Sequence, residues 1–179
     1  RDSFKFTNTF GSEASVPFSA KKVLNGRTLK ANEFSFTLSG MGIDTQTKKN
    51  LADGTVTFDS LKFAYNATAE QIEAGYIDVT NLLDKTTNKY ELDLTIAEVT
   101  TGLPANVTPV APTNYAVKVT VEYNPETGEL TASANRNNAD FVFTNTYSTK
   151  GEITFSGTKT LANRTLTEGE FSFELYDDL

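Results

Sequence analysis

One seven-residue stretch occurs twice in this chain, and this repetition constrains the fold more than any other feature. Residues 141–147 read FVFTNTY and residues 4–10 read FKFTNTF, so five of seven positions are identical at a spacing of 137 residues. Residues 18–38 and 155–175 are identical at twelve of 21 positions, at the same spacing and with no gap. Chance does not produce two such matches at one spacing. We therefore interpret the chain as part of a tandem repeat of period 137.

The repeat divides the chain into three parts. Residues 1–10 are expected to be the last strand of a preceding repeat, residues 11–148 a complete repeat, and residues 149–179 the first strands of a following repeat. Because the chain begins abruptly within a strand-like stretch, we interpret it as a portion of a longer protein.

Alternation of apolar and polar residues predicts that residues 11–148 are mostly β-structure. In the last segment Phe141, Phe143 and Tyr147 share one face, and Asn145 lies among them. The same alternation predicts strands at residues 18–24, 34–38, 55–63, 90–98, 115–123 and 130–134. About seven short strands separated by turn residues predict an all-β fold, namely an immunoglobulin-like β-sandwich.

One helix and two loops complete the expected secondary structure. Thr68 and Gln71 have the spacing of a capping box, and Gly75 follows as a stop signal. We therefore expect one short helix that connects strands and does not fill the core. Residues 41–54 are polar and rich in turn formers, and residues 78–89 read as an insertion, so both are expected to be loops.

The composition excludes several classes of function. The 179 residues include no histidine and no cysteine, so the commonest metal ligand and general base is missing, and so is all thiol and disulfide chemistry. A net charge of −7 argues against nucleic acid or an anionic membrane as partner, and no segment is long and apolar enough to span a bilayer. Asp44, Asp53 and Asp59 do not have the spacing of a calcium-binding loop. We expect neither a cofactor nor a metal.

Three polar residues fall on strand faces that are otherwise apolar. Lys22 is in phase with the first strand's apolar residues, Glu98 with those of the strand at 90–98, and Asn145 with the aromatic face of the last strand. Each could simply lie at a strand end, where the face meets solvent, because lysine and glutamate are rarely buried unless they are paired. The repeat weakens that interpretation, since Lys22 recurs as Lys159 and Asn145 recurs as Asn8.

An amine, a carboxyl and an amide brought together in a core can react. Desolvation disfavours the charged forms of amines and carboxyls, and a neutral Lys22 amine is a nucleophile. A protonated Glu98 could polarise the amide carbonyl of Asn145 and then move protons as ammonia leaves. The predicted product is a Lys22–Asn145 isopeptide bond, which replaces a buried amine by a neutral amide.

The sequence also resembles a known family. The segment GTKTLANRTLTEGEFSFEL at residues 157–175, a strand ending in Glu98-Val99, and FTNTY at residues 143–147 resemble the isopeptide domains of Gram-positive pilins and surface adhesins. The match is to the streptococcal pilin isopeptide-linkage type, which is related to the B-type repeats of collagen adhesins. The resemblance implies a CnaB-like sandwich in which Lys22 is bonded to Asn145 and Glu98 is the catalytic residue.

Two rival residues were weighed against this assignment. Lys21 neighbours Lys22, but its phase is outward and its counterpart in the repeat is Thr158. Glu122 faces away from the valines of its strand, unlike Glu98. The stretch at residues 77–89 departs from the family pattern, which affects the strand boundaries there and leaves the three residues unchanged.

These features predict a structural module of a bacterial stalk. We expect a shaft unit of a pilus or fibrillar adhesin, extracellular and attached to the cell wall of a Gram-positive bacterium, with adjacent repeats or copies of the same protein as partners. It would be no enzyme, because its single reaction is autocatalytic and happens once. The alternative is an adhesin module that binds a glycan or a host protein, for which Tyr65 and Tyr76 are the nearest candidates.

Overall fold

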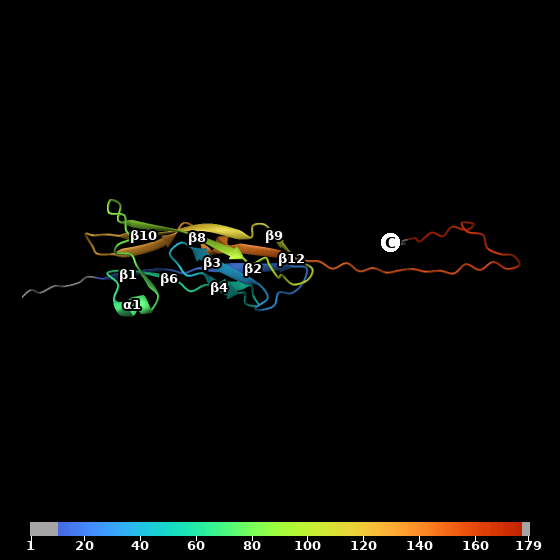
Figure 1. Ribbon diagram of the computed structural model, residues 1–179, viewed down its shortest axis with the longest axis horizontal. Coiled ribbons are helices and arrows are strands. Elements are labelled where there is room, and N and C mark those ends of the chain that lie inside the picture. Colours follow the sequence, from blue (N-terminus) through green and yellow to red (C-terminus); the bar gives the residue numbers. More distant parts are fainter. Residues whose placement is uncertain (1–10, 177–179) are drawn as a thin grey trace, which may run out of the picture. The chain divides into compact units, whose positions relative to one another are not determined.

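The computed structural model describes residues 11–176, and the chain divides after Ser148 into two units. All strands and helices of the described residues belong to the first unit, which Figure 1 shows coloured along the sequence. The described part of the second unit, residues 149–176, contains bends and turns but neither helix nor strand.

The largest sheet of the first unit has five strands. Its order is β11-β10-β8-β3-β4, and all neighbouring strands are antiparallel. The strands are β3 (Ser35–Gly40), β4 (Gln46–Lys49), β8 (Lys89–Glu98), β10 (Asn114–Tyr123) and β11 (Leu130–Ala134). The turn at residues 124–128 joins β10 to β11 as a hairpin, as the sequence predicts.

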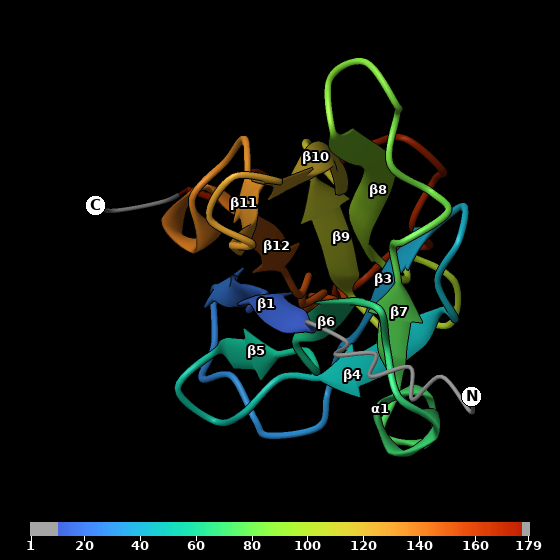
Figure 2. The same ribbon diagram turned by 90° about the vertical axis from the view of Figure 1, so that its left-hand side faces the viewer.

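Two smaller sheets lie on the other side of the core. One has the order β5-β2-β12-β9, and in it β2 and β12 are parallel. Its strands are β2 (Ser19–Asn25), β5 (Thr55–Thr57), β9 (Val107–Val110) and β12 (Val142–Tyr147). The other sheet consists of β1 (Ser12–Val16), β6 (Leu61–Tyr65) and β7 (Tyr76–Asp78). In Figure 2, β8 and β10 lie on one side of the unit, and β1, β5 and β6 lie on the other.

A single short α-helix connects β6 to β7. The helix α1 spans Ala69–Glu73, and its capping box is complete, because Gln71 N donates to Thr68 Oγ1 and Thr68 N donates to Gln71 Oε1. Since β6 and β7 are parallel, the chain needs a crossover between them, and α1 provides it. A 3₁₀-helix, η1 (Asn138–Asp140), precedes β12. The predicted connecting helix is thus confirmed.

The core is built from alternating residues of both layers. Along residues 92–98 of β8 and 117–121 of β10 every second side chain points inward and is buried, and the aromatic residues of β12 face them. The buried set includes Phe36, Leu38, Leu92, Leu94, Ile96, Val117, Val119, Val121, Phe141 and Phe143. Each of these side chains, removed from water, contributes about 1.5–3 kcal/mol. The predicted all-β, immunoglobulin-like sandwich is therefore confirmed.

The prediction of a loop throughout residues 41–54 is wrong, because β4 (Gln46–Lys49) lies within it. This strand reads Gln-Thr-Lys-Lys and occupies the sheet edge, where neither face is fully buried, so it shows no apolar alternation. Strands β1, β7 and β9 also had no prediction, and all three are short. The loop expected at residues 78–89 is confirmed except at its two ends, where β7 stops and β8 starts.

Candidate functional site: a buried lysine, glutamate and asparagine

The parallel pairing of β2 and β12 brings the second and the last strand of the sandwich together. Lys22 is in register with Phe143, and Leu24 is in register with Asn145. Because residues two apart on a strand share a face, Lys22 and Asn145 point to the same side as diagonal neighbours. Glu98 is the last residue of β8 and reaches the same place from the five-stranded sheet.

The three side chains meet on a single oxygen atom. Lys22 Nζ lies 2.5 Å from Glu98 Oε1, and Asn145 Nδ2 donates to the same Oε1 at 2.8 Å. The side chains of Lys22 and Glu98 are 0% and 1% exposed, and Asn145 is fully buried. The structure thus brings together the three residues that the sequence singled out.

Asn145 keeps one polar atom without a partner. Among the described residues its Oδ1 is buried and accepts no hydrogen bond. Leaving such a group unsatisfied costs about 1–3 kcal/mol. A half-turn about the Cβ–Cγ bond exchanges Oδ1 and Nδ2, and a protonated Glu98 would then donate to the carbonyl oxygen. The site therefore holds an amide whose carbonyl can be polarised by its neighbour.

Aromatic rings surround the amine. Lys22 Nζ lies 4.4 Å from the centroid of the Phe34 ring and 6.0 Å from that of Phe36, which in turn lies 5.2 Å from the Phe143 ring. Burial lowers the pKa of Lys22, and the hydrogen bond that Lys22 donates to Glu98 partly opposes this effect. Deprotonation of Lys22 is therefore easier than that of an exposed lysine, and only the neutral amine has the lone pair that a nucleophile needs.

The rival residues lie outside the core. Lys21 is exposed, and its Nζ donates to Asp53 O at 2.6 Å. Glu122 is exposed and forms an ion pair with Lys89 at 3.2 Å. Within residues 11–176, Lys22 and Glu98 are the only buried residues that can carry charge. Their pairing compensates the burial that either would not tolerate alone.

A fourth buried polar residue, Asn50, was not predicted from the sequence. Its Oδ1 accepts from Phe34 N at 2.8 Å, and its Nδ2 donates to Lys30 O at 2.8 Å and to Leu51 O at 2.9 Å. All its polar side-chain atoms are thus bonded, and they fix the loop that precedes β3. Asn50 directly follows β4. Because β4 shows no alternation of apolar and polar residues, the sequence did not indicate which residues there face the core.

Of the two partial sites predicted from the repeat, Asn8 and Lys159, the structure describes only Lys159. Asn8 lies outside the described residues. Lys159 is exposed in the second unit, and its Nζ lies 4.8 Å from the centroid of the Phe171 ring. The same contact joins Lys22 to Phe34 in the first unit, at the same sequence separation.

Residues 11–176 contain no group of three or more acidic, histidine or cysteine side chains that could hold a metal ion. Asp53 accepts from Thr55, and Asp59 pairs with Lys48 at 2.7 Å. None of the helices in the described part of the chain is long and apolar enough to cross a membrane.

A β-sandwich whose core joins a lysine, a glutamate and an asparagine has the layout of isopeptide-containing domains. Residues 18–148 match the FctA family, described as Spy0128-like isopeptide containing domain, and the chain therefore belongs to this family. Domains of this family are pilin domains of the cell surface that polymerise with adjacent subunits, so the general role is structural, in a pilus shaft. No curated protein and no solved structure matches the chain.

Proposed function

We propose that Lys22 and Asn145 form an intramolecular isopeptide bond with Glu98 as the catalytic residue. The observation that carries this proposal is the pair of contacts to Glu98 Oε1, 2.5 Å from Lys22 Nζ and 2.8 Å from Asn145 Nδ2, in a site closed to water. One carboxyl group is thus within proton-transfer distance of both the nucleophile and the leaving group.

The reaction balances without any external reagent. A proton moves from the Lys22 ammonium to Glu98, which leaves a neutral amine and a carboxylic acid. The Lys22 Nζ lone pair attacks Asn145 Cγ and forms the new C–N bond, while the Glu98 proton moves to the amide oxygen. The Glu98 carboxylate then accepts the surplus proton from Nζ and delivers it to Nδ2. The Cγ–Nδ2 bond breaks, one ammonia leaves, and the proton on the oxygen returns to Glu98 as the carbonyl forms again.

The expected biological role is mechanical. The bond would tie β2 to β12, the first and last strands of the four-stranded sheet, and the domain would act as a shaft unit of a pilus or fibrillar adhesin on a Gram-positive cell wall. It would turn over no external substrate, because its lysine and asparagine are consumed in the bond.

The neighbouring units are proposed to carry the same chemistry. Residues 149–179 would begin a following repeat with Lys159 as its lysine, and Asn8 would be the asparagine of a preceding repeat. Adjacent repeats, or copies of the same protein, would supply the groups that are missing from each. The Lys159–Phe171 contact supports this, since it reproduces the Lys22–Phe34 contact of the first unit.

The ligand-binding alternative has weaker support. Tyr65 is stacked on Tyr123 with ring centroids 3.9 Å apart, so it serves packing. Tyr76 lines an open groove of about 740 Å³, but its hydroxyl donates to Glu13 at 2.8 Å, and Lys62 Nζ lies over its ring, 5.3 Å from the centroid. Neither ring is presented free for stacking on a sugar.

Intact mass spectrometry of the purified full chain tests the proposal. The wild-type protein should weigh one ammonia less than its sequence, and Lys22→Ala should have its full sequence mass. Lys21→Ala is the matched control, because it removes the adjacent exposed lysine and should still lose ammonia. A folded wild-type protein of full sequence mass would overturn the proposal.

A further inference from the structure

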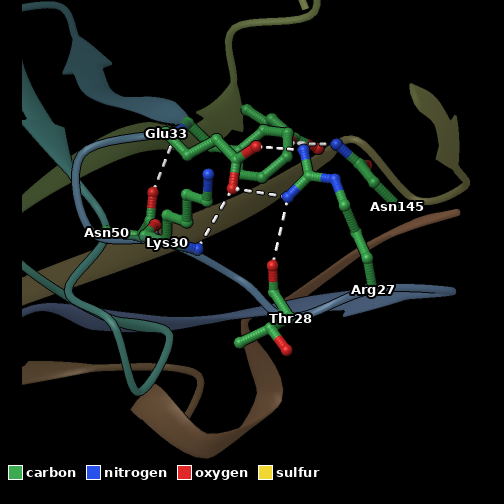
Figure 3. Close-up of polar contacts among 8 residues, drawn as sticks. Arg27, Thr28, Lys30, Glu33, Asn50 and Asn145 are labelled. Atoms are coloured by element: carbon green, nitrogen blue, oxygen red, sulfur yellow. Dashed lines mark hydrogen bonds and ion pairs between the residues drawn. The ribbon is translucent and has the colours of Figure 1, made fainter. Parts of the chain in front are cut away.

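The turn that follows β2 contains a second, partly buried ion pair, between Arg27 and Glu33, which we call the clasp. Arg27 Nη1 donates to Glu33 Oε2 at 3.2 Å and to Thr28 O at 3.1 Å, and Nη2 donates to Glu33 Oε1 (Figure 3). Lys30 N donates to Glu33 Oε2 at 3.1 Å. The arginine and glutamate side chains are 25% and 12% exposed. A bidentate pair of this kind fixes both side chains in one orientation.

The clasp contacts the end of the strand that carries Asn145. The guanidinium carbon of Arg27 lies 4.8 Å from the centroid of the Tyr147 ring. Gly26, just before it, has φ +92°, and a Cβ on Gly26 would lie 2.1 Å from Tyr147 O. Tyr147 is two residues beyond Asn145 on the same strand face. The end of β12 therefore packs against the clasp and against the glycine that precedes it.

The clasp also adjoins the wall of the reactive site. Glu33 immediately precedes Phe34, whose ring lies 4.4 Å from Lys22 Nζ. Phe34 N is held by Asn50 Oδ1 at 2.8 Å. The same short segment thus links the Tyr147 contact to the aromatic wall beside the lysine.

The second unit contains the same clasp without any sheet. Arg164 Nη1 donates to Glu170 Oε2 at 3.0 Å and to Thr165 O at 3.4 Å, Nη2 donates to Glu170 Oε1, and Thr167 N donates to Glu170 Oε2 at 3.2 Å. These residues lie in a segment, 149–176, that contains no strand or helix. All hydrogen bonds of the clasp join residues at most six apart in sequence, and they are present here without a strand or helix.

The backbone of the clasp recurs as well. Gly26 and Asn32 flank the clasp of the first unit with φ of +92° and +62°, and Asn163 and Gly169 flank that of the second with +73° and +77°. Glycine and asparagine have exchanged places, yet both positions keep a residue that tolerates the left-handed region. Both positions thus keep a left-handed backbone conformation, although four of the eight residues in this segment differ between the two copies.

We propose that the clasp is a positioning element for isopeptide formation, an inference that rests on the proposed function. It forms locally before the last strand is in place, and its guanidinium face receives Tyr147. Docking of this ring sets the register of β12 against β2. Since a shift of one residue would turn Asn145 to the outer face, this register determines whether the amide reaches Lys22 and Glu98.

The test measures the rate of ammonia loss in the full chain. The chain is made by cell-free translation in a short pulse, and its intact mass is followed during the chase. Arg27→Gln should slow bond formation about tenfold, the effect expected from losing a partly desolvated cation–π contact and its bidentate support. Arg164→Gln is the matched control, because it breaks the identical clasp of the second unit and should leave the rate unchanged.

Two further variants separate positioning from general stability. Tyr147→Phe keeps the ring and should react at the wild-type rate, whereas Tyr147→Leu should be slowed as much as Arg27→Gln. The double variant Arg27→Gln/Tyr147→Leu should be no slower than either single variant, because both remove one contact. Arg27→Lys should form the bond as slowly as Arg27→Gln, because lysine keeps the charge but lacks the planar guanidinium that makes bidentate contacts.

The outcomes are distinguishable. If wild type loses no ammonia, the proposed function itself fails. If wild type reacts and folded Arg27→Gln reacts at the same rate, only the positioning role is overturned. Should Arg27→Gln fail to fold by circular dichroism, the comparison of Tyr147→Phe with Tyr147→Leu decides, and equal rates for those two overturn the inference.

Discussion

Lys22 Nζ and Glu98 Oε1 lie 2.5 Å apart in the core although 76 residues separate them in sequence. The two residues belong to different sheets, so their contact spans the interior of the sandwich. A buried ion pair is costly unless further hydrogen bonds complete it, and here Asn145 supplies only one, leaving its own oxygen unpaired. The arrangement is better suited to reaction than to stability.

Glu98 should be required for the bond and not for the fold. In Glu98→Gln the side chain keeps its shape but cannot accept the proton of Lys22, so the protein should retain its full sequence mass. Intact mass together with far-ultraviolet circular dichroism checks this. A folded Glu98→Gln protein that still loses ammonia would remove Glu98 from its assigned role.

The bond should stabilise the domain strongly. It would close a loop of 123 residues, the interval from residue 22 to residue 145. By analogy with disulfides, closing about 100 residues contributes roughly 4–5 kcal/mol through the unfolded state. Lys22→Ala should therefore lower the melting temperature and increase protease sensitivity, while Lys21→Ala should change neither. An unchanged melting temperature in Lys22→Ala would contradict the cross-link.

The unbonded protein should become more stable as the pH rises. Burial lowers the pKa of Lys22, opposed by Glu98 and more weakly by Glu33, so the unfolded state binds the lysine proton more tightly than the folded state. The free energy of unfolding should then increase between the lowered folded pKa and the unfolded value of 10.5. Urea unfolding of Asn145→Ala measures this slope, and Lys22→Met in that background is the control. Equal slopes for the two proteins would show that Lys22 does not titrate differently on folding.

Gly26 should be far less replaceable than Gly75. Both have φ in the left-handed region, at +92° and +82°, where alanine costs about 1–2 kcal/mol. A Cβ at residue 26 would also lie 2.1 Å from Tyr147 O, whereas one at residue 75 has no atom within 4 Å. Gly26→Ala should therefore lower the melting temperature more than Gly75→Ala, as calorimetry can show. The opposite order would mean that the close approach of the turn to β12 is unimportant.

The domain should resist extension by force. Because β2 and β12 are parallel neighbours, a pull on the two ends of the unit shears them, and the proposed bond crosses that pair. Force–extension measurements on tandem copies should show that wild-type units release only the residues outside the 22–145 loop. Lys22→Ala units should extend to full contour length. Wild-type units that extend fully would contradict the mechanical role.

The sequence predicted best those parts where burial imposes alternation. Strands β8, β10 and β12 each pack one face against the core, so their phase also revealed which residues, Glu98 and Asn145 among them, point inward. Strand β4 was missed because an edge strand of polar residues has no buried face to pattern it. Asn50 was missed because its hydrogen-bond partners are backbone groups of a loop, and no sequence pattern identifies such partners.

The partnership of the three side chains was inferable, but the distances were not. Phase placed Lys22, Glu98 and Asn145 on inward faces, while the parallel pairing of β2 with β12 depends on topology. Nor could any pattern show that both donors would use one oxygen of Glu98. The clasp could have been suspected, since Arg27 and Glu33 recur as Arg164 and Glu170.

The strands that carry Lys22 and Asn145 lie near the two ends of the unit's sequence, and this order determines when the proposed bond could form. During synthesis Lys22 is made early and Asn145 near the end of the unit, so no covalent ring can form until β12 has been made. Until then the chain can pass lengthwise through a narrow channel. In the proposed reaction the loss of ammonia would make the step irreversible, and residues 22–145 would become a covalent ring that could no longer pass through such a channel. The order of the strands would thus permit passage first and close the ring afterwards.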